Sequence, residues 1–162
     1  MSQRVGERRR AREYALQLLF QLDLCPEQTE GAVDQFWVGK RVAEGVRCFA
    51  DQIVAGTMAH RDAIDQMLAS HAVNWRISRM AVVDRNILRM ALYEFFFDPE
   101  TPRVVVIDEA IEIAKKFGND QSGPFINGIL DAIRLKLEAG ELELPTGSAL
   151  PAAAIPERST VS

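Results

Sequence analysis

The sequence of 162 residues predicts an all-helical protein. Two observations support this fold class. Apolar residues recur at the three-to-four-residue spacing of an amphipathic helix over most of the chain. Proline and glycine residues interrupt these periodic stretches at the places where helices are expected to begin and end. The hydrophobic fraction of 48% is that of an ordinary globular protein, and the length permits one full-sized core or two small subdomains that share one.

The first predicted helix carries one apolar stripe and ends at a proline. Cys25-Pro26 ends it, because proline lacks the backbone N–H and biases the preceding residue away from helical geometry. A short helix is expected around Val33–Val38, within a less regular segment. The stripe of the first helix consists of Ala11, Ala15, Leu18, Leu19 and Leu22.

A long helix is predicted from about Arg41 to Ser70, followed by a turn at Asn74–Ser78. The next periodic segment, from about Val83 to Phe95, is apolar on two faces, which is typical of a helix at the centre of a bundle. Asp98-Pro99 is expected to stop this central helix.

The run Val104–Ile107 has the composition of a strand, but the residues after it continue with helical spacing, so a helix is predicted. Gly118 is expected to end this helix as a C′ glycine. A last helix follows Pro124 and closes at Gly140. Residues 143–162 lack any periodicity and are predicted to form a disordered tail.

A dense cluster of arginines lies near the start of the chain. Residues 1–13 carry a local charge of +3, so the rest of this protein of net charge −4 must carry −7. Such a local excess indicates a polyanion site, although an arginine-rich, solvated helix start is the simpler alternative. Positive charge at a helix N-terminus opposes the helix dipole, and the planar guanidinium suits phosphates, so we favour the functional interpretation. The cluster consists of Arg4, Arg8, Arg9, Arg10 and Arg12.

Motifs of catalysis, cofactor binding and metal binding are absent from the sequence. No nucleotide-binding glycine loop, nucleophile elbow or zinc-protease motif occurs. His60 and His71 lack metal-ligand spacing. Cys25 and Cys48 are expected to be reduced thiols. The sequence therefore predicts neither an enzyme nor a cofactor. We also expect no membrane span, because no stretch approaches about eighteen uncharged apolar residues.

Two further residues stand out by their positions on predicted helices. Glu94 occupies a position where an apolar residue is expected, so it must reach solvent or form a buried ion pair with an arginine. Asp84 lies on the flank of the same helix and belongs either to that pairing or to a partner surface. Phe125 sits at the border of the last apolar stripe, where it either packs on a neighbouring helix or stacks on a base beside a helix N-terminus.

Several blocks, taken together, resemble the NusB family of transcription antitermination factors. They are RRRAREYALQLLFQ at Arg8–Gln21, MAVVDRNILRMALYEF at Met80–Phe95, VIDEAIEIAKKFG at Val106–Gly118 and FINGILD at Phe125–Asp131. The resemblance implies one domain over residues 1–142, made of two packed three-helix bundles with short connecting helices. The N-terminal bundle is expected at about 8–75 and the C-terminal bundle at about 76–140.

The same resemblance implies a function. Family members bind boxA RNA of ribosomal RNA leaders with the ribosomal protein NusE, and act with NusA, NusG and RNA polymerase in the cytoplasm. It implies RNA contacts by the arginine cluster and by Phe125, and a NusE-facing surface that includes Asp84 and Glu94. The chain departs from many relatives at Pro124, where a basic residue is expected, and this removes one expected phosphate contact.

Two alternatives remain open from the sequence. The N-terminal domain of some ribosomal RNA cytosine methyltransferases is similar to NusB, but such an enzyme needs a further catalytic domain that this sequence does not contain. A helical adaptor without an RNA role is the second alternative, and the arginine cluster argues against it.

Overall fold

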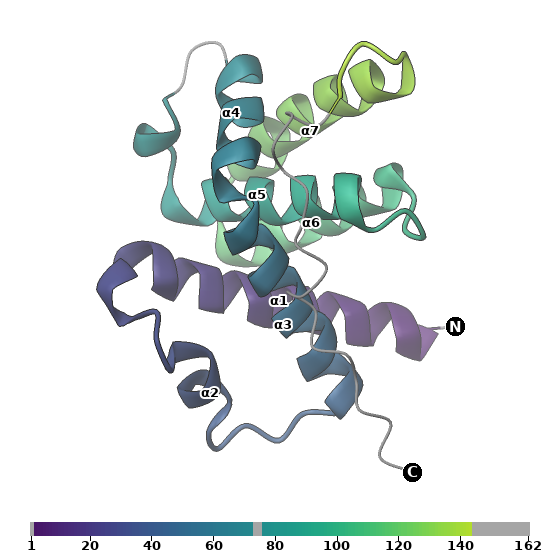
Figure 1. Cartoon of the computed structure of the whole chain (residues 1–162). Coiled ribbons are helices and arrows are strands. Elements are labelled where there is room, and N and C mark those ends of the chain that lie inside the picture. Colours follow the sequence, from purple (N-terminus) through teal and green to yellow (C-terminus); the bar gives the residue numbers. More distant parts are fainter. Residues whose placement is uncertain (1, 73–75, 144–162) are drawn as a thin grey trace.

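The computed structural model describes residues 2–72 and 76–143, with side chains described from residue 6 onward, and all regular elements within these ranges are helices (Figure 1). The predicted disordered tail lies outside the described residues from position 144, as does part of the turn expected at Asn74–Ser78. The helices are α1 (Ser2–Leu24), α2 (Ala32–Trp37), α3 (Glu44–Ala59), α4 (Arg61–His71), α5 (Val82–Phe97), α6 (Arg103–Phe117) and α7 (Ser122–Glu138). Short 3₁₀ helices lie at Pro26–Gln28 and Ile77–Arg79.

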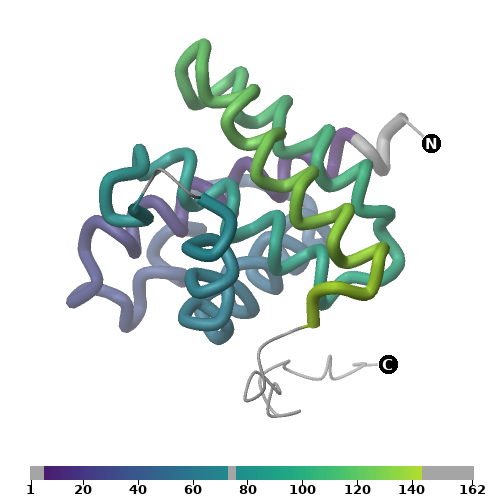
Figure 2. Tube along the Cα trace, turned by 90° about the horizontal axis from the view of Figure 1, so that it is seen from above, coloured from purple at the N-terminus to yellow at the C-terminus, as the bar shows by residue number. Residues whose placement is uncertain are grey.

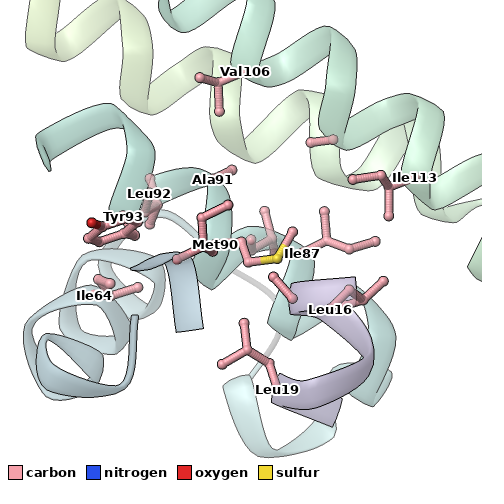
Figure 3. Packing of buried hydrophobic residues seen from close by; sticks show 14 of the residues in the cluster. Leu16, Leu19, Ile64, Ile87, Met90, Ala91, Leu92, Tyr93, Val106 and Ile113 are labelled. Atoms are coloured by element: carbon pink, nitrogen blue, oxygen red, sulfur yellow. The ribbon is translucent and has the colours of Figure 1, made fainter. Parts of the chain in front are cut away.

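The helices are arranged around α5, as its apolar pattern predicted. Helix α1 packs mainly against α3, and α6 packs mainly against α7, with which it runs side by side in Figure 2. Helix α5 contacts α1, α3, α4, α6 and α7, and its residues from 86 to 95 are all buried. Figure 3 shows Leu16 and Leu19 of α1 on the side of Ile87 and Met90 of α5, so one core joins both groups of helices.

The single helix predicted from Arg41 to Ser70 is wrong, because the chain turns at His60. Helix α3 ends at Ala59 and α4 begins at Arg61, and the backbone of His60 leaves helical geometry with φ −108° and ψ 16°. A side chain at position 56 would collide with the ring of Tyr93, with only 2.1 Å between an added Cβ and its Cε2 atom. The close approach at Gly56 and the turn at His60 bring α4 onto α5 and α7. Apolar spacing continues through the turn, so periodicity alone does not reveal it.

The strand-like run Val104–Ile107 lies in α6, as its helical continuation predicted. Gly118 does end this helix, but for a different reason from the expected one. Its φ is −98°, so the left-handed C′ geometry is absent. A Cβ at position 118 would instead lie 2.4 Å from the hydroxyl oxygen of Ser122, which is buried. Gly118 therefore allows the start of α7 to fold tightly back onto the end of α6.

A polar network joins the end of α1 to α4 and α5. Asp23 accepts hydrogen bonds from Arg85 at 2.6 Å and from Asn86 at 2.9 Å, and Arg89 also reaches it at 3.1 Å. Arg89 extends to Asp65 of α4 through two further hydrogen bonds. Burial tends to raise the pKa of the Asp23 carboxyl, but the hydrogen bonds from Arg85 and Asn86 and the nearby arginine charges lower it overall. This network fixes the far end of α1 against the rest of the core.

His60 gives the fold a pH dependence that can be measured. Its ring is 5% exposed and stacks on Phe97 with 4.1 Å between the ring centroids, and burial lowers its pKa below the ordinary 6.5. Above pH 6.5 the ring is neutral in both states; below it the unfolded chain takes up a proton that the folded chain resists. We predict that the free energy of unfolding falls as pH drops below 6.5, and that His60→Gln removes this slope. Urea denaturation at several pH values between 5 and 8 measures how the free energy of unfolding depends on pH.

The other histidine of the chain, His71, provides the matched control for that experiment. The variant His71→Gln removes the other imidazole and leaves His60 in place, so it isolates the contribution of His60 to the slope. A slope that persists in His60→Gln and disappears in His71→Gln would contradict the assignment.

Candidate nucleic-acid interface

The arginine cluster is part of a regular helix from its first residue onward. Helix α1 begins at Ser2, so Arg8 to Arg12 lie in its second and third turns. The unfavourable effect of the helix dipole falls off within the first turn and therefore concerns Arg4 alone among the five arginines. Arg4 has helical backbone geometry, and its side chain lies outside what the structure describes.

Arg12 is the most buried of the described arginines in the cluster. It is 3% exposed and forms three hydrogen bonds to the carboxylate of Glu94 on α5, the shortest of them 2.7 Å. Glu94 is itself 2% exposed, which confirms the prediction of a buried ion pair with an arginine. Burial raises the pKa of the Glu94 carboxyl, and the Arg12 hydrogen bonds oppose that rise.

The burial of Arg12 and Glu94 does not fit the RNA contact and the NusE contact that the resemblance implied for them. Contact between Arg12 and a phosphate would require the pair to open, which would leave an uncompensated carboxylate in the core. Glu94 likewise offers almost no surface to a partner protein. Asp84, in the first turn of α5, is 8% exposed, and its Oδ1 atom is buried without a hydrogen-bond partner among the described residues.

Arg9 and Arg8 also contact the second half of the chain, but both remain partly accessible. Arg9 forms two hydrogen bonds with Glu109 of α6, at 2.8 and 2.9 Å, while 41% of its side chain stays exposed. The hydrogen bond from Arg9 lowers the pKa of the Glu109 carboxyl. Arg8 donates to the hydroxyl of Thr101 at 3.1 Å and lies over the ring of Phe49.

Arg10 points away from these contacts. It is exposed, stacks its guanidinium 5.7 Å from the centroid of the Tyr14 ring, and donates to the Tyr14 hydroxyl at 3.2 Å. No carboxylate among the described residues lies within ion-pair distance of it. Arg10 therefore presents an uncompensated charge, whereas Arg9 shares its charge with Glu109.

The end of α6, which leads into α7, is tied to α1. Lys116, near the end of α6, forms an ion pair with Glu13 of α1 at 2.9 Å. The loop after Gly118 then leads directly into α7, where Phe125 lies in the first turns, half-buried and packed against the core. Pro124 is the third residue of this helix, two residues after Ser122, rather than the first. Arg8, Arg9 and Arg10, here called the arginine face, and Phe125 thus lie on two helices that both contact α6.

A cleft of about 520 Å³ lies between the end of α6 and the start of α7. Its polar lining combines an ammonium group, two side-chain amides and a carboxylate, which can hydrogen-bond the edge of a base or a sugar. Sequence reasoning missed this cleft, because its residues are spread over three segments and none is unusual alone. The polar lining residues are Lys115, Asn119, Asp120 and Asn127.

Two other kinds of site are absent from the described residues. No group of three or more His, Cys, Asp or Glu side chains there is arranged to hold a metal ion. None of the described helices is both long enough and apolar enough to cross a membrane. Cys25 and Cys48 are free thiols.

Known proteins resemble this chain over most of its length. The model of the NusB family matches residues 9–134. A transcription antitermination protein NusB of Myxococcus xanthus is 42% identical over 138 residues, which cover 82% of this chain and 98% of that protein. The protein of the same description from Trichlorobacter lovleyi is 46% identical over 129 residues, covering 80% and 91% of the two chains.

Solved structures agree with this result. The structure of T. maritima NusB superposes with a TM-score of 0.73 at 34% identity, covering 83% of this chain and 97% of that one. A crystal structure of the antitermination factors NusB and NusE in complex with double-stranded RNA superposes with a TM-score of 0.71 at 26% identity, covering 79% and 96%.

The buried pair yields a prediction about stability. Truncation of one partner of a buried ion pair typically costs about 3–5 kcal/mol, because the other charge is left buried alone. We therefore expect Glu94→Ala to lower the free energy of unfolding by about that amount. In the double variant Arg12→Met with Glu94→Leu both charges are gone, so much of the loss should be recovered. Urea denaturation of the parent, of Glu94→Ala and of the double variant measures these differences in the free energy of unfolding.

The exposed pair of Lys115 and Glu112 is the control, with 3.1 Å between the charged atoms. Lys115→Ala should cost at most about 1 kcal/mol. Equal losses in Lys115→Ala and Glu94→Ala would show that burial of the pair has no special weight.

Proposed function

The chain belongs to the NusB family, and on that premise we propose that it is a transcription antitermination factor. In this proposal it binds boxA RNA of ribosomal RNA leaders together with NusE and supports processive transcription with NusA, NusG and RNA polymerase in the cytoplasm. The named relatives, and the structure of a NusB–NusE complex with RNA, support the proposal. We propose no catalytic role and no cofactor, in keeping with a family of regulators.

The observation that supports the RNA role is that the arginines of the cluster differ in their exposure to solvent. One side of α1 directs Arg12 into the core, while Arg10 and part of Arg9 stay available at the surface. We propose that Arg8, Arg9 and Arg10 contact RNA phosphates and that Arg4 extends this row. Arg12 and Glu94 would instead position the helix.

Phe125 and the adjacent cleft would then read the RNA. Phosphate contacts position RNA without specifying its sequence, so stacking and base-edge hydrogen bonds must provide discrimination. Phe125 stands at a helix start beside a cleft lined by the amides of Asn119 and Asn127. We propose that a base stacks on Phe125 while a neighbouring base enters the cleft.

The NusE-facing surface remains a proposal that rests on the resemblance. Asp84 is held in the first turn of α5, where a negative charge suits the helix dipole. Its buried, unpartnered oxygen would accept a hydrogen bond from a partner only if the surrounding side chains move. The two-bundle division near residue 75 is proposed on the same basis, although α4 packs on α5 and α7.

The methyltransferase and adaptor alternatives are separated from this proposal by RNA binding. Titration of a boxA-containing RNA, with and without NusE, against a scrambled RNA is the direct test. We expect preferential binding of boxA that NusE strengthens. Equal binding of boxA and scrambled RNA under both conditions would overturn the proposed function.

The salt dependence of binding tests the arginine face. Each phosphate contact to single-stranded RNA contributes about 0.7 to the slope of log affinity against log salt. We predict that Arg10→Gln lowers this slope by about 0.7, because its charge is exposed and unshared. Lys136→Gln, which removes an exposed positive charge on α7, is the control and should leave the slope unchanged. An unchanged slope in Arg10→Gln would exclude a phosphate contact there.

The role of Phe125 is tested separately. Stacking of one base on an aromatic side chain contributes about 1–3 kcal/mol, so Phe125→Ala should weaken boxA binding by that amount without changing the salt slope. The control is Leu137→Ala, a truncation of a half-buried residue at the other end of α7. Melting temperatures separate stability from affinity. If both variants lose stability and neither loses affinity, Phe125 serves the core alone.

A further inference from the structure

Beyond the arginine face, a row of aromatic rings with two uncompensated cations extends across α1 and α2. The ring of Tyr14, on α1, contacts the ring of Phe36 on α2 with 6.1 Å between centroids. Arg10 stacks on Tyr14, and the ammonium of Lys40 lies 3.9 Å from the centroid of the Phe36 ring. The contacts thus run without a break in the order Arg10, Tyr14, Phe36, Lys40.

The rings hold the two cations in defined places at the surface. Tyr14 and Phe36 are half-buried and pack against the core. The buried ring of Trp37 makes edge-to-face contacts with both, with 5.2 Å between its centroid and that of Tyr14 and 5.0 Å to that of Phe36. Lys40 is exposed, and its ammonium also donates to the backbone carbonyl of Phe36. A cation held over an aromatic face keeps its charge while losing part of its conformational freedom.

The charge on this row is not neutralised by the protein. Within the described part of the chain, no carboxylate lies within ion-pair distance of Arg10 or Lys40. Arg47 makes the contrast clear. It also stacks on an aromatic ring, that of Trp37 at 5.7 Å, but lies 3.8 Å from Asp34 and 3.7 Å from Asp51. Two positive charges without carboxylate partners, set beside aromatic rings, have the chemistry of a surface that binds a nucleic-acid backbone.

We propose that this row, defined as Arg10, Tyr14, Phe36 and Lys40, binds the single-stranded RNA segment that flanks the boxA element. The occupant follows from charge complementarity and from continuity, because Arg10 belongs both to this row and to the proposed boxA contacts. RNA that leaves the arginine face along α1 meets Lys40 next. In Figure 1, α2 lies on the opposite side of α1 from α6 and α7, so the RNA would pass from the α6–α7 side across α1 to α2.

The proposal rests on the proposed function, and its test separates the two. The full chain is titrated with a minimal boxA RNA and with the same RNA extended by several uridines at the 5′ or at the 3′ end. We expect tighter binding and a salt slope larger by about 0.7 for one of the two extended RNAs. Lys40→Gln should abolish this increment and leave binding of the minimal RNA unchanged. Failure of the minimal RNA to bind the parent chain both with and without NusE would overturn the proposed function itself.

The matched control is Arg47→Gln, which removes a stacked but neutralised cation from the same region. It should keep the full increment. If neither extension adds to the slope, or if Arg47→Gln and Lys40→Gln reduce it equally, the flank does not follow this row and the inference is wrong.

A direct readout complements the titration. A photoreactive thiouridine placed in the flank should crosslink to the peptide that contains Phe36 and Lys40, and the crosslink should weaken in Lys40→Gln. A crosslink that maps only to α6 or α7 would contradict the proposed path.

Discussion

The buried contact between Arg12 and Glu94 determines how the rest of the molecule is arranged. It joins α1 to the central helix α5 through three hydrogen bonds in a region that water hardly reaches. Such a pair adds little net stability, because the cost of removing two charges from water offsets most of their attraction. It is effective at selecting one arrangement, since a rotation of α1 would turn Arg12 away and leave Glu94 buried and unpaired. The orientation of every other arginine in the cluster follows from this constraint.

The rotation of α1 fixed in this way distributes the arginines into different roles. Arg12 faces the core, Arg9 meets Glu109 at the boundary, and Arg10 faces solvent beside Tyr14. A run of four arginines within five positions therefore does not act as one uniform patch. Its members differ in exposure because a helix turns by about 100° per residue, so residues one and two apart point in different directions. The proposed RNA face consists of those that the helix turns outward.

Much of this architecture could be predicted from the sequence, since local pattern and global packing agree. The helical continuation after Val104–Ile107 was sufficient to overrule the strand-like composition of that run. The charged residue at position 94, on an apolar stripe, indicated either access to solvent or a buried arginine partner, and the structure shows the second. The sequence could not identify which arginine, because partners 82 residues apart are brought together only by the tertiary fold. The turn at His60 was missed because apolar spacing continues through it, and the close approach of the Tyr93 ring to Gly56 nearby is likewise formed only by the tertiary fold.

The contacts of α1 with α6 and with the loop before it have a consequence for synthesis of the chain on the ribosome. The partners of Arg8, Arg9 and Glu13 lie 93, 100 and 103 residues further along the sequence. The first segment to emerge must therefore wait for almost the whole ordered chain before its side chains take their final positions. Contacts of such long sequence separation form late, because the entropy of closing the intervening loop is lost before they can stabilise anything. A nascent chain cut short before α5 would carry all of its N-terminal arginines without Glu94 and Glu109, the carboxylates that orient Arg12 and Arg9, and would bind polyanions without a defined geometry.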